Sequence, residues 1–198
     1  LTYAPKGFES FRQAMSSSTN SKLFFKAMIR SEIQRISNSG HCPQILFGNH
    51  HRSHAASAFF PSPFEKSVVL CMDGVGEWAT TSVWRGEKSK LIPKWELKFP
   101  HSLGLLYSAF TYYAGFRVNS GEYKLMGLAP YGEAKFVNRI LENLIDLKKD
   151  GSFRMNMEFF DYVVGFCMIN EKFEKLFGMP RRQPEAEIHK HYMDIARS

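Results

Sequence analysis

The sequence predicts a fold of the α/β class. Two short apolar runs, residues 44–47 (QILF) and 67–73 (SVVLCMD), are typical of buried strands. Residues 21–37 and 133–149, in contrast, space their apolar side chains as amphipathic helices do. The chain has 198 residues, 44% of them hydrophobic, which is enough for a packed core in one or two domains.

The first part of the chain predicts two helices and a strand. Residues 16–20 (SSSTN) are typical of a loop that ends in a helix cap, and the helix over 21–37 follows them. Gly40 stands just beyond the expected end of this helix. The strand over 44–47 comes next. Residues 50–60 (HHRSHAASAFF) then predict a second helix, which the prolines that follow should stop.

The middle of the chain predicts an antiparallel meander and a capped helix. Residues 79–86 alternate in polarity and carry β-branched side chains, and residues 95–99 have a similar pattern. With the strand over 67–73, they make three consecutive strands. Ser102 is a suitable N-cap for a helix over 103–116, because its hydroxyl can accept a hydrogen bond from the first helical turn.

The last part of the chain has a weaker pattern. Residues 152–160 indicate a strand, residues 170–178 a short helix that ends near Gly178, and residues 187–198 a final helix. The sequence starts without methionine and stops inside this last helical pattern. We therefore expect the chain to be cut from a longer protein at both ends.

Composition argues against several classes of protein. No apolar run approaches the roughly 18 residues of a transmembrane helix, and the first residues lack the layout of a signal peptide. Cys42, Cys71 and Cys167 have no CxxC spacing, which argues against a disulfide framework or a cysteine zinc site and favours a cytoplasmic location. The net charge of +7 permits anionic ligands, but the basic residues are dispersed, so we expect no nucleic-acid partner.

A histidine-rich segment is the first candidate for chemistry. His50 and His54 stand four residues apart on the predicted helix, so their rings project from one face and can bind one metal ion. His51 points away from that face and is a weaker candidate. The alternative is that both histidines are simply half-buried polar residues.

The strand over 67–73 ends on a carboxylate, Asp73, in the sequence DGVGE. A carboxylate at the end of a buried strand is costly unless it is paired or bound to a cation. Gly74 and Gly76 permit a tight turn with amides open to an anion, and Glu77 closes the motif. The alternative is a plain β-hairpin turn. Two imidazoles and a carboxylate suit iron(II), with zinc or manganese as alternatives.

A third motif is NSGEYKLMGLAPYGE, over residues 119–133. Glu122 and Lys124 are the charged residues inside this otherwise apolar, glycine-punctuated stretch. They are candidates for binding a nucleotide or substrate. The alternative is a Glu–Lys pair on a surface turn.

Together these motifs resemble a known family. The segments HHRSHAASAFFPSPF, VVLCMDGVGEWATTSVW and GEYKLMGLAPYGE, with APKGFESFRQAM near the start, are similar to the carbamoyltransferases. That family includes the nodulation-factor O-carbamoyltransferases and the antibiotic carbamoyltransferases of the cephamycin and tobramycin type. The resemblance covers most of residues 4–135 and fades between 151 and 182.

The resemblance implies part of an actin-like ATPase (ASKHA) domain, a mixed sheet with flanking helices. Residues 1–65 or so would be the end of its first subdomain, and residues from about 66 to 198 the start of its second. It also implies a second domain, missing from this chain, that activates carbamoyl phosphate with ATP to a carbamoyl-adenylate. The actin-like domain would then pass the carbamoyl group to a hydroxyl of a small acceptor.

The resemblance further implies that His50, His54 and Asp73 bind a metal, usually iron(II), together with a later aspartate that this chain lacks. We therefore expect the fragment alone to be inactive. No general base can be named, and His51 is a speculative candidate. Two alternatives stay open: a metal- or nucleotide-binding module without activity, and a relative of the tRNA threonylcarbamoyl-transferases, which share the HxxxH motif. The acceptor is not specified.

Overall fold

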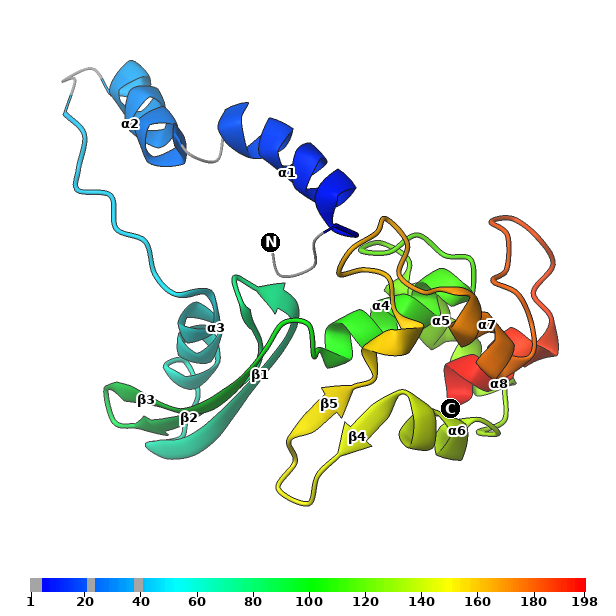
Figure 1. The fold of residues 1–198 in the computed structure, drawn as a ribbon. Coiled ribbons are helices and arrows are strands. Elements are labelled where there is room, and N and C mark those ends of the chain that lie inside the picture. The colour runs from blue at the N-terminus through cyan, green and yellow to red at the C-terminus, as the bar shows by residue number, and fades with distance from the viewer. Residues whose placement is uncertain (1–4, 21–23, 38–40) are drawn as a thin grey trace. The chain divides into compact units, whose positions relative to one another are not determined.

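The computed structural model describes residues 5–20, 24–37 and 41–198 (Figure 1). The chain separates into two compact units. The first contains residues 1–49 and 164–166, and the second contains residues 50–163 and 167–198. Helices and strands are both present, as the predicted α/β class requires.

The first unit is helical, and two predictions for it are wrong. Helix α1 spans Phe8–Asn20 and α2 spans Phe25–Ile36. The predicted loop over 16–20 is the last part of α1, because no proline or glycine interrupts that helix. Residues 44–47 form no strand, since no neighbouring strand in the described part of the chain pairs with them. The helix predicted over 21–37 is confirmed within its described residues by α2.

The second unit contains the predicted meander. Strands β1 (Lys66–Gly76), β2 (Ala79–Glu87) and β3 (Lys90–Lys98) form an antiparallel sheet in the order β1-β2-β3. Helix α3 (His50–Phe59) packs against one face of this sheet (Figure 1). A small apolar cluster fills the contact; its members are Ala55, Phe59, Val69, Cys71 and Trp84. The helix predicted over 50–60 is thus confirmed.

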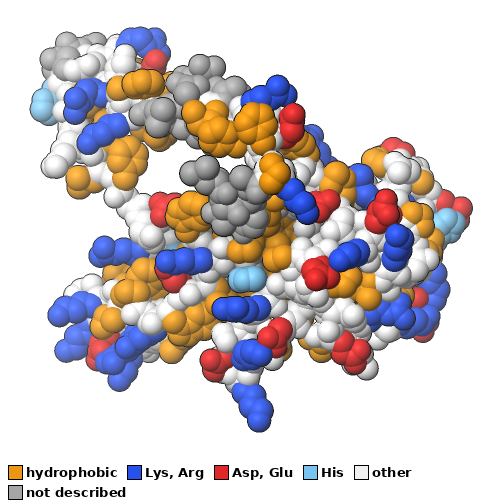
Figure 2. Space-filling model, viewed as in Figure 1, with side chains coloured by type: hydrophobic (Ala, Val, Ile, Leu, Met, Phe, Trp, Pro, Cys, Tyr) orange, Lys and Arg blue, Asp and Glu red, His pale blue; other side chains and the backbone are white. Residues whose placement is uncertain are grey.

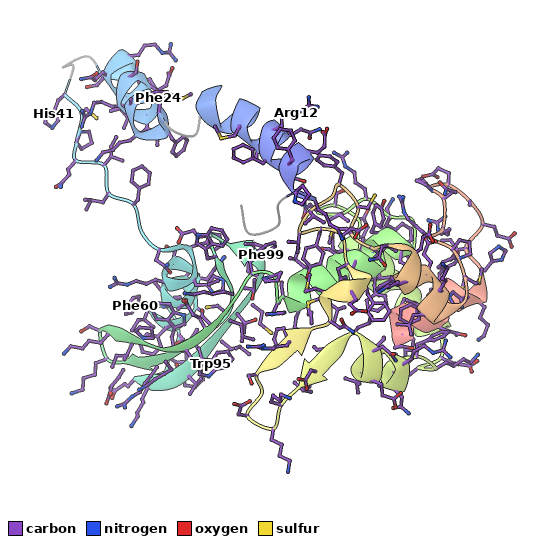
Figure 3. All side chains as sticks on the ribbon, in the orientation of Figure 1. Arg12, Phe24, His41, Phe60, Trp95 and Phe99 are labelled. Carbon is purple, nitrogen blue, oxygen red and sulfur yellow. The ribbon has the colours of Figure 1, made fainter. Side chains whose placement is uncertain are left out.

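The other face of the sheet is apolar and exposed. Val68, Leu70 and Met72 alternate along β1 with the buried residues and point away from α3. Hydrophobic side chains are visible over the sheet, with lysines and arginines around them (Figure 2). Trp95 extends from β3 among the side chains of this region (Figure 3).

The rest of the second unit is built around a larger core. Its elements are α4 (Leu103–Tyr113), α5 (Glu122–Leu128), η2 (Ala129–Tyr131), α6 (Val137–Asn143), β4 (Ile145–Leu147), β5 (Phe153–Met155), η3 (Met157–Phe159), α7 (Glu171–Phe177) and α8 (Lys190–Arg197). Phe173 lies at its centre, with its ring 5.3 Å from that of Phe110 and 5.4 Å from that of Tyr113. The predictions of a cap at Ser102 and of a helix end at Gly178, where φ is 79°, are confirmed.

Two predictions here are only partly right. The helix predicted over 133–149 is confined to α6, because Leu144 is buried and its carbonyl accepts a hydrogen bond from the Asn156 amide. The chain then continues as β4, which pairs with β5. The strand predicted over 152–160 is β5 followed by η3. Within the described ranges, no helix has both the length and the apolar character needed to cross a membrane.

Candidate metal centre

Two elements of the second unit bring three potential ligands together. His50 is the first residue of α3 and His54 lies one turn later, so both rings leave the same side of the helix. Asp73 lies near the end of β1, which packs directly beneath α3. The predicted convergence of the histidine pair with this carboxylate is therefore seen in the structure.

His50 lies within hydrogen-bonding distance of the other two side chains. His50 Nε2 lies 2.7 Å from Asp73 Oδ2 and 2.9 Å from His54 Nε2. His54 Nε2 lies 3.8 Å from the same carboxylate oxygen. The side chains are part-exposed, at 43%, 55% and 32% for His50, His54 and Asp73, so a ligand can reach them from solvent.

The donor set fits a divalent cation. Atoms that share a cation at about 2.1 Å lie about 3.0–3.4 Å apart in octahedral or tetrahedral geometry. The three observed separations, 2.7, 2.9 and 3.8 Å, lie on either side of that range. Small side-chain movements would therefore bring all three atoms onto one ion, and coordination positions would remain open on the exposed side.

The local electrostatics keep the carboxylate ionised. Burial by itself would raise the Asp73 pKa, but hydrogen bonds from the His50 ring and the Gly74 amide outweigh it and hold that pKa below its ordinary value. The Gly74 amide donates to Asp73 Oδ1 over 2.6 Å. The carboxylate is therefore charged at neutral pH, as a metal ligand must be.

His51 has a different environment from its neighbours. It is 1% exposed, and its Nδ1 lies 2.7 Å from the Ser82 hydroxyl oxygen. Burial lowers its pKa, and the negative charge of Asp73 opposes that effect only in part. This environment disfavours His51 as a general base, because the ring does not face the open side of the cluster.

The DGVGE segment does not form the turn that the glycines suggest. Asp73 and Gly74 lie inside β1, where the pairing with β2 shifts register, and Gly76 pairs with Ala79. The two-residue turn follows at 77–78, with Glu77 in the left-handed region at φ 64°. The Gly74 amide donates to Asp73 Oδ1 in this structure, and a contact of Gly74 with an anion stays a prediction.

Sequence reasoning missed the residues that support Asp73 from below. The Ser102 hydroxyl lies 3.0 Å from the Asp73 carbonyl oxygen and 2.8 Å from that of Gly74. Gly104 lies so close to the same backbone that an added Cβ would stand 2.7 Å from the Asp73 carbonyl oxygen. The cap signal of Ser102 was visible in the sequence, but its contact with a distant strand was not.

Glu122 and Lys124 lie outside the three-residue cluster, on α5. The Glu122 carboxylate accepts hydrogen bonds from the Asn119 amide at 2.8 Å, the Ser108 hydroxyl at 3.1 Å and the Gly121 amide at 3.1 Å. These bonds hold the loop between α4 and α5. The Lys124 ammonium lies 6.0 Å from the Phe116 ring. A role of either residue toward a nucleotide stays a prediction.

Comparison with known proteins defines the class to which this geometry belongs. The sequence matches the family described as "Carbamoyltransferase N-terminus" over residues 1–198. The chain therefore belongs to the carbamoyltransferase family.

Individual relatives agree with that assignment. The chain is 59% identical to the uncharacterized protein sll1178 of Synechocystis sp. over 203 residues, covering 100% of the chain and 32% of that protein. It is 33% identical to the nodulation protein NolNO of Sinorhizobium fredii, over 73% of the chain and 21% of the relative. The nodulation protein NolO of Bradyrhizobium diazoefficiens is 30% identical, over 71% of the chain and 25% of that protein. The chain thus spans a third or less of the length of these relatives.

Proposed function

We propose that the protein is an O-carbamoyltransferase, which transfers a carbamoyl group to a hydroxyl of a small acceptor. Family membership supports the reaction class. The observation that carries the proposal furthest is the convergence of His50, His54 and Asp73, because it gives this chain a place where a reacting group can be held. An actin-like fold, with a subdomain boundary near residue 65, and a cytoplasmic location are parts of the same proposal.

In this proposal the three clustered side chains hold a divalent cation, iron(II) first, with zinc or manganese as alternatives. The bound cation would supply Lewis-acid polarisation of a phosphate or carbonyl oxygen. His50 and His54 contribute neutral imidazole donors from one face of α3. Asp73 contributes the negative charge, which its hydrogen bonds already stabilise in the folded protein.

The carbamoyl group would come from carbamoyl phosphate, activated with ATP to a carbamoyl-adenylate by a further domain of the longer protein. Gly74, Gly76, Glu77, Glu122 and Lys124 are the proposed contacts to the nucleotide or substrate in this chain. Of these, Gly74 and Gly76 adjoin the cluster, because the Gly74 amide donates to Asp73 Oδ1 and Gly76 lies against the His50 ring. No membrane or nucleic acid is part of the proposed reaction.

The test uses the full-length protein with carbamoyl phosphate, ATP and a panel of hydroxyl acceptors, and mass spectrometry of the products. We expect a carbamoylated acceptor to form, and we expect His54→Ala to prevent it. The same variant should lose metal affinity by more than about 100-fold, since a direct ligand matters more than the supporting groups, whose loss costs about 10–100-fold. The matched control is His189→Ala, which removes an exposed imidazole that is not part of the cluster.

Metal binding without any carbamoyl transfer would instead indicate a binding module with no activity of its own. Carbamoyl transfer by His54→Ala at the native rate, with native metal content, would contradict the assignment of the site. Tight binding of tRNA that resists added salt would point to the threonylcarbamoyl-transferase branch.

A further inference from the structure

A buried hydrogen-bonded network lies between α3 and β2, beneath the cluster of His50, His54 and Asp73. We propose that this network, formed by the side chains of Trp84, Ser82 and His51, positions the metal ligands. It fixes the rotation of α3 so that the two histidines face the carboxylate. This inference rests on the proposed metal centre and assigns it positioning residues that do not themselves touch the ion.

The network has three members, and all three are buried. Trp84 Nε1 lies 2.8 Å from the Ser82 hydroxyl oxygen, and that oxygen lies 2.7 Å from His51 Nδ1. His51 is 1% exposed, Ser82 2% and Trp84 8%. These hydrogen bonds connect the second residue of α3 to two positions on the α3-facing side of β2.

Chemistry fixes the direction of one hydrogen bond in this network. An indole N–H can only donate, so the Ser82 oxygen accepts from Trp84. The same hydroxyl forms a hydrogen bond with His51 Nδ1, and the tautomer of the ring sets which of the two donates. The other ring nitrogen, Nε2, is buried and has no hydrogen-bond partner among the described residues. The ring is therefore anchored through one nitrogen only, on the side of β2.

Polar groups in this position are unusual for their surroundings. Trp84 belongs to the apolar cluster around Ala55 and Phe59, and Ser82 pairs with its member Cys71, so a polar group left without a partner here is costly. The indole nitrogen, the hydroxyl and His51 Nδ1 are all bonded, and such buried bonds favour one arrangement of the elements that they join. Packing alone would allow α3 to rotate slightly, whereas the hydrogen bond to Ser82 sets one rotation.

That rotation determines where the ligands point. Successive residues of an α-helix are turned by about 100°, so holding His51 inward directs His50 and His54 to the adjoining face. Gly76 supports the same arrangement, because a Cβ there would stand 2.4 Å from His50 Cδ2 and 2.7 Å from His51 Cδ2. His50 and His51 thus lie against Gly76 of β1, and His51 also bonds Ser82 of β2, while the exposed side of the three-ligand cluster stays open to solvent.

The test is titration of the full-length, metal-free protein with cobalt(II), followed by its visible d–d absorption, which reports ligand geometry. We expect Ser82→Ala to weaken cobalt(II) binding by about 10–100-fold and to change the d–d spectrum, as loss of a supporting partner does. Thr111→Val is the matched control: it removes a buried hydroxyl that donates to the Tyr107 carbonyl, outside the cluster. The control should keep native cobalt(II) affinity even if its melting temperature falls as far as that of Ser82→Ala.

Cobalt(II) affinity within twofold of native and an unchanged spectrum in Ser82→Ala would overturn the proposal. If Ser82→Ala does not fold, Trp84→Phe removes the indole donor together with part of a buried ring, and a native spectrum in that variant would overturn the proposal equally. His51→Asn keeps a polar atom near the Nδ1 position and should retain more affinity than His51→Leu; equal losses would count against the hydrogen bond as the cause.

The outcome separates this inference from the reaction. If the native protein and His54→Ala bind cobalt(II) equally, the ligand assignment fails, and the positioning role fails with it. If Ser82→Ala loses affinity as expected while no acceptor is carbamoylated, the positioning role stands and only the proposed reaction is wrong.

Discussion

Gly76 shows how one missing side chain shapes the candidate centre. It ends β1 directly against the first two residues of α3, and an added Cβ would stand 2.4 Å from a ring carbon of His50. Real Cβ atoms do not approach other atoms that closely, so the ring would have to move. Gly74, two residues earlier, has nothing within 4 Å of the equivalent position. The two glycines of the motif therefore have different roles.

We predict that Gly76→Ala displaces His50 from Asp73 and weakens metal binding by about 10-fold or more, an effect comparable with loss of a supporting group. Gly74→Ala is the control and should keep native affinity, because space for its methyl group exists. Isothermal titration with zinc(II) measures both. Equal affinities for the two variants would show that the close approach at Gly76 does not restrain the rings.

At this scale the sequence was informative only where spacing alone determines geometry. His50 and His54 could be paired because a helix places residues four apart on one face. Asp73 could be added because it follows an apolar strand. Ser82 could not be recognised, because its partnership with His51 depends on which residue of β2 lies opposite α3. That register comes from the pairing of Cys71 with Ser82, which no local pattern encodes.

Among the elements, α4 connects the centre to the larger core. Its N-cap, Ser102, accepts a hydrogen bond from the Leu105 amide and is in contact with the Asp73 and Gly74 carbonyls. The Ser102 hydroxyl thus caps the first turn of α4 and also bonds the backbone of β1 at Asp73. Because the residue is completely buried, water cannot replace these bonds.

We predict that Ser102→Ala destabilises the protein by about 1–2 kcal/mol, the usual cost of losing a buried cap. It should also weaken metal binding, because the Asp73 backbone loses its support. Asn170→Ala is the control, since it removes the cap of α7, which accepts from the Lys172 and Phe173 amides away from the cluster. Urea unfolding and zinc(II) titration on both variants test this. A matching loss of affinity in the control would show that general destabilisation is the cause.

The elements themselves were predictable where local signals agree. The meander of β1, β2 and β3 has alternating polarity and short turns, and α7 has both an Asn cap and a glycine end. The predictions failed where long-range packing decides. Residues 44–47 are apolar enough for a strand but have none to pair with in the described structure, whereas Ile145 leaves the helical pattern because β5 is available to it.

For the second unit as a whole, the centre lies where a small core meets a large one. α3 and β1 rest on the small apolar cluster, while α4 belongs to the large core that also includes residues of α7 and α8. The small cluster alone buries few side chains. The position of Asp73 should therefore depend on the stability of the large core, through α4. Residues that hold α8 to that core are the place to test how the unit responds to pH.

Asp194 on α8 accepts hydrogen bonds from the Glu133 amide at 2.8 Å and from Lys135 Nζ at 3.0 Å. The amide first, and then Lys135, hold its pKa below the ordinary 3.8, against the effect of burial. A lowered carboxyl pKa stabilises the fold at neutral pH, and that contribution is lost as the pH falls below 3.8 through the folded value.

We predict that Asp194→Asn is less stable than native at neutral pH and that the difference shrinks in acid. Urea midpoints at about pH 7, 5 and 3 measure it. The exposed pair of Asp146 and Lys148 supplies the control, because Asp146→Asn should change little at any pH. A difference for Asp194→Asn that stays constant into acid would mean that its charge contributes nothing to holding α8.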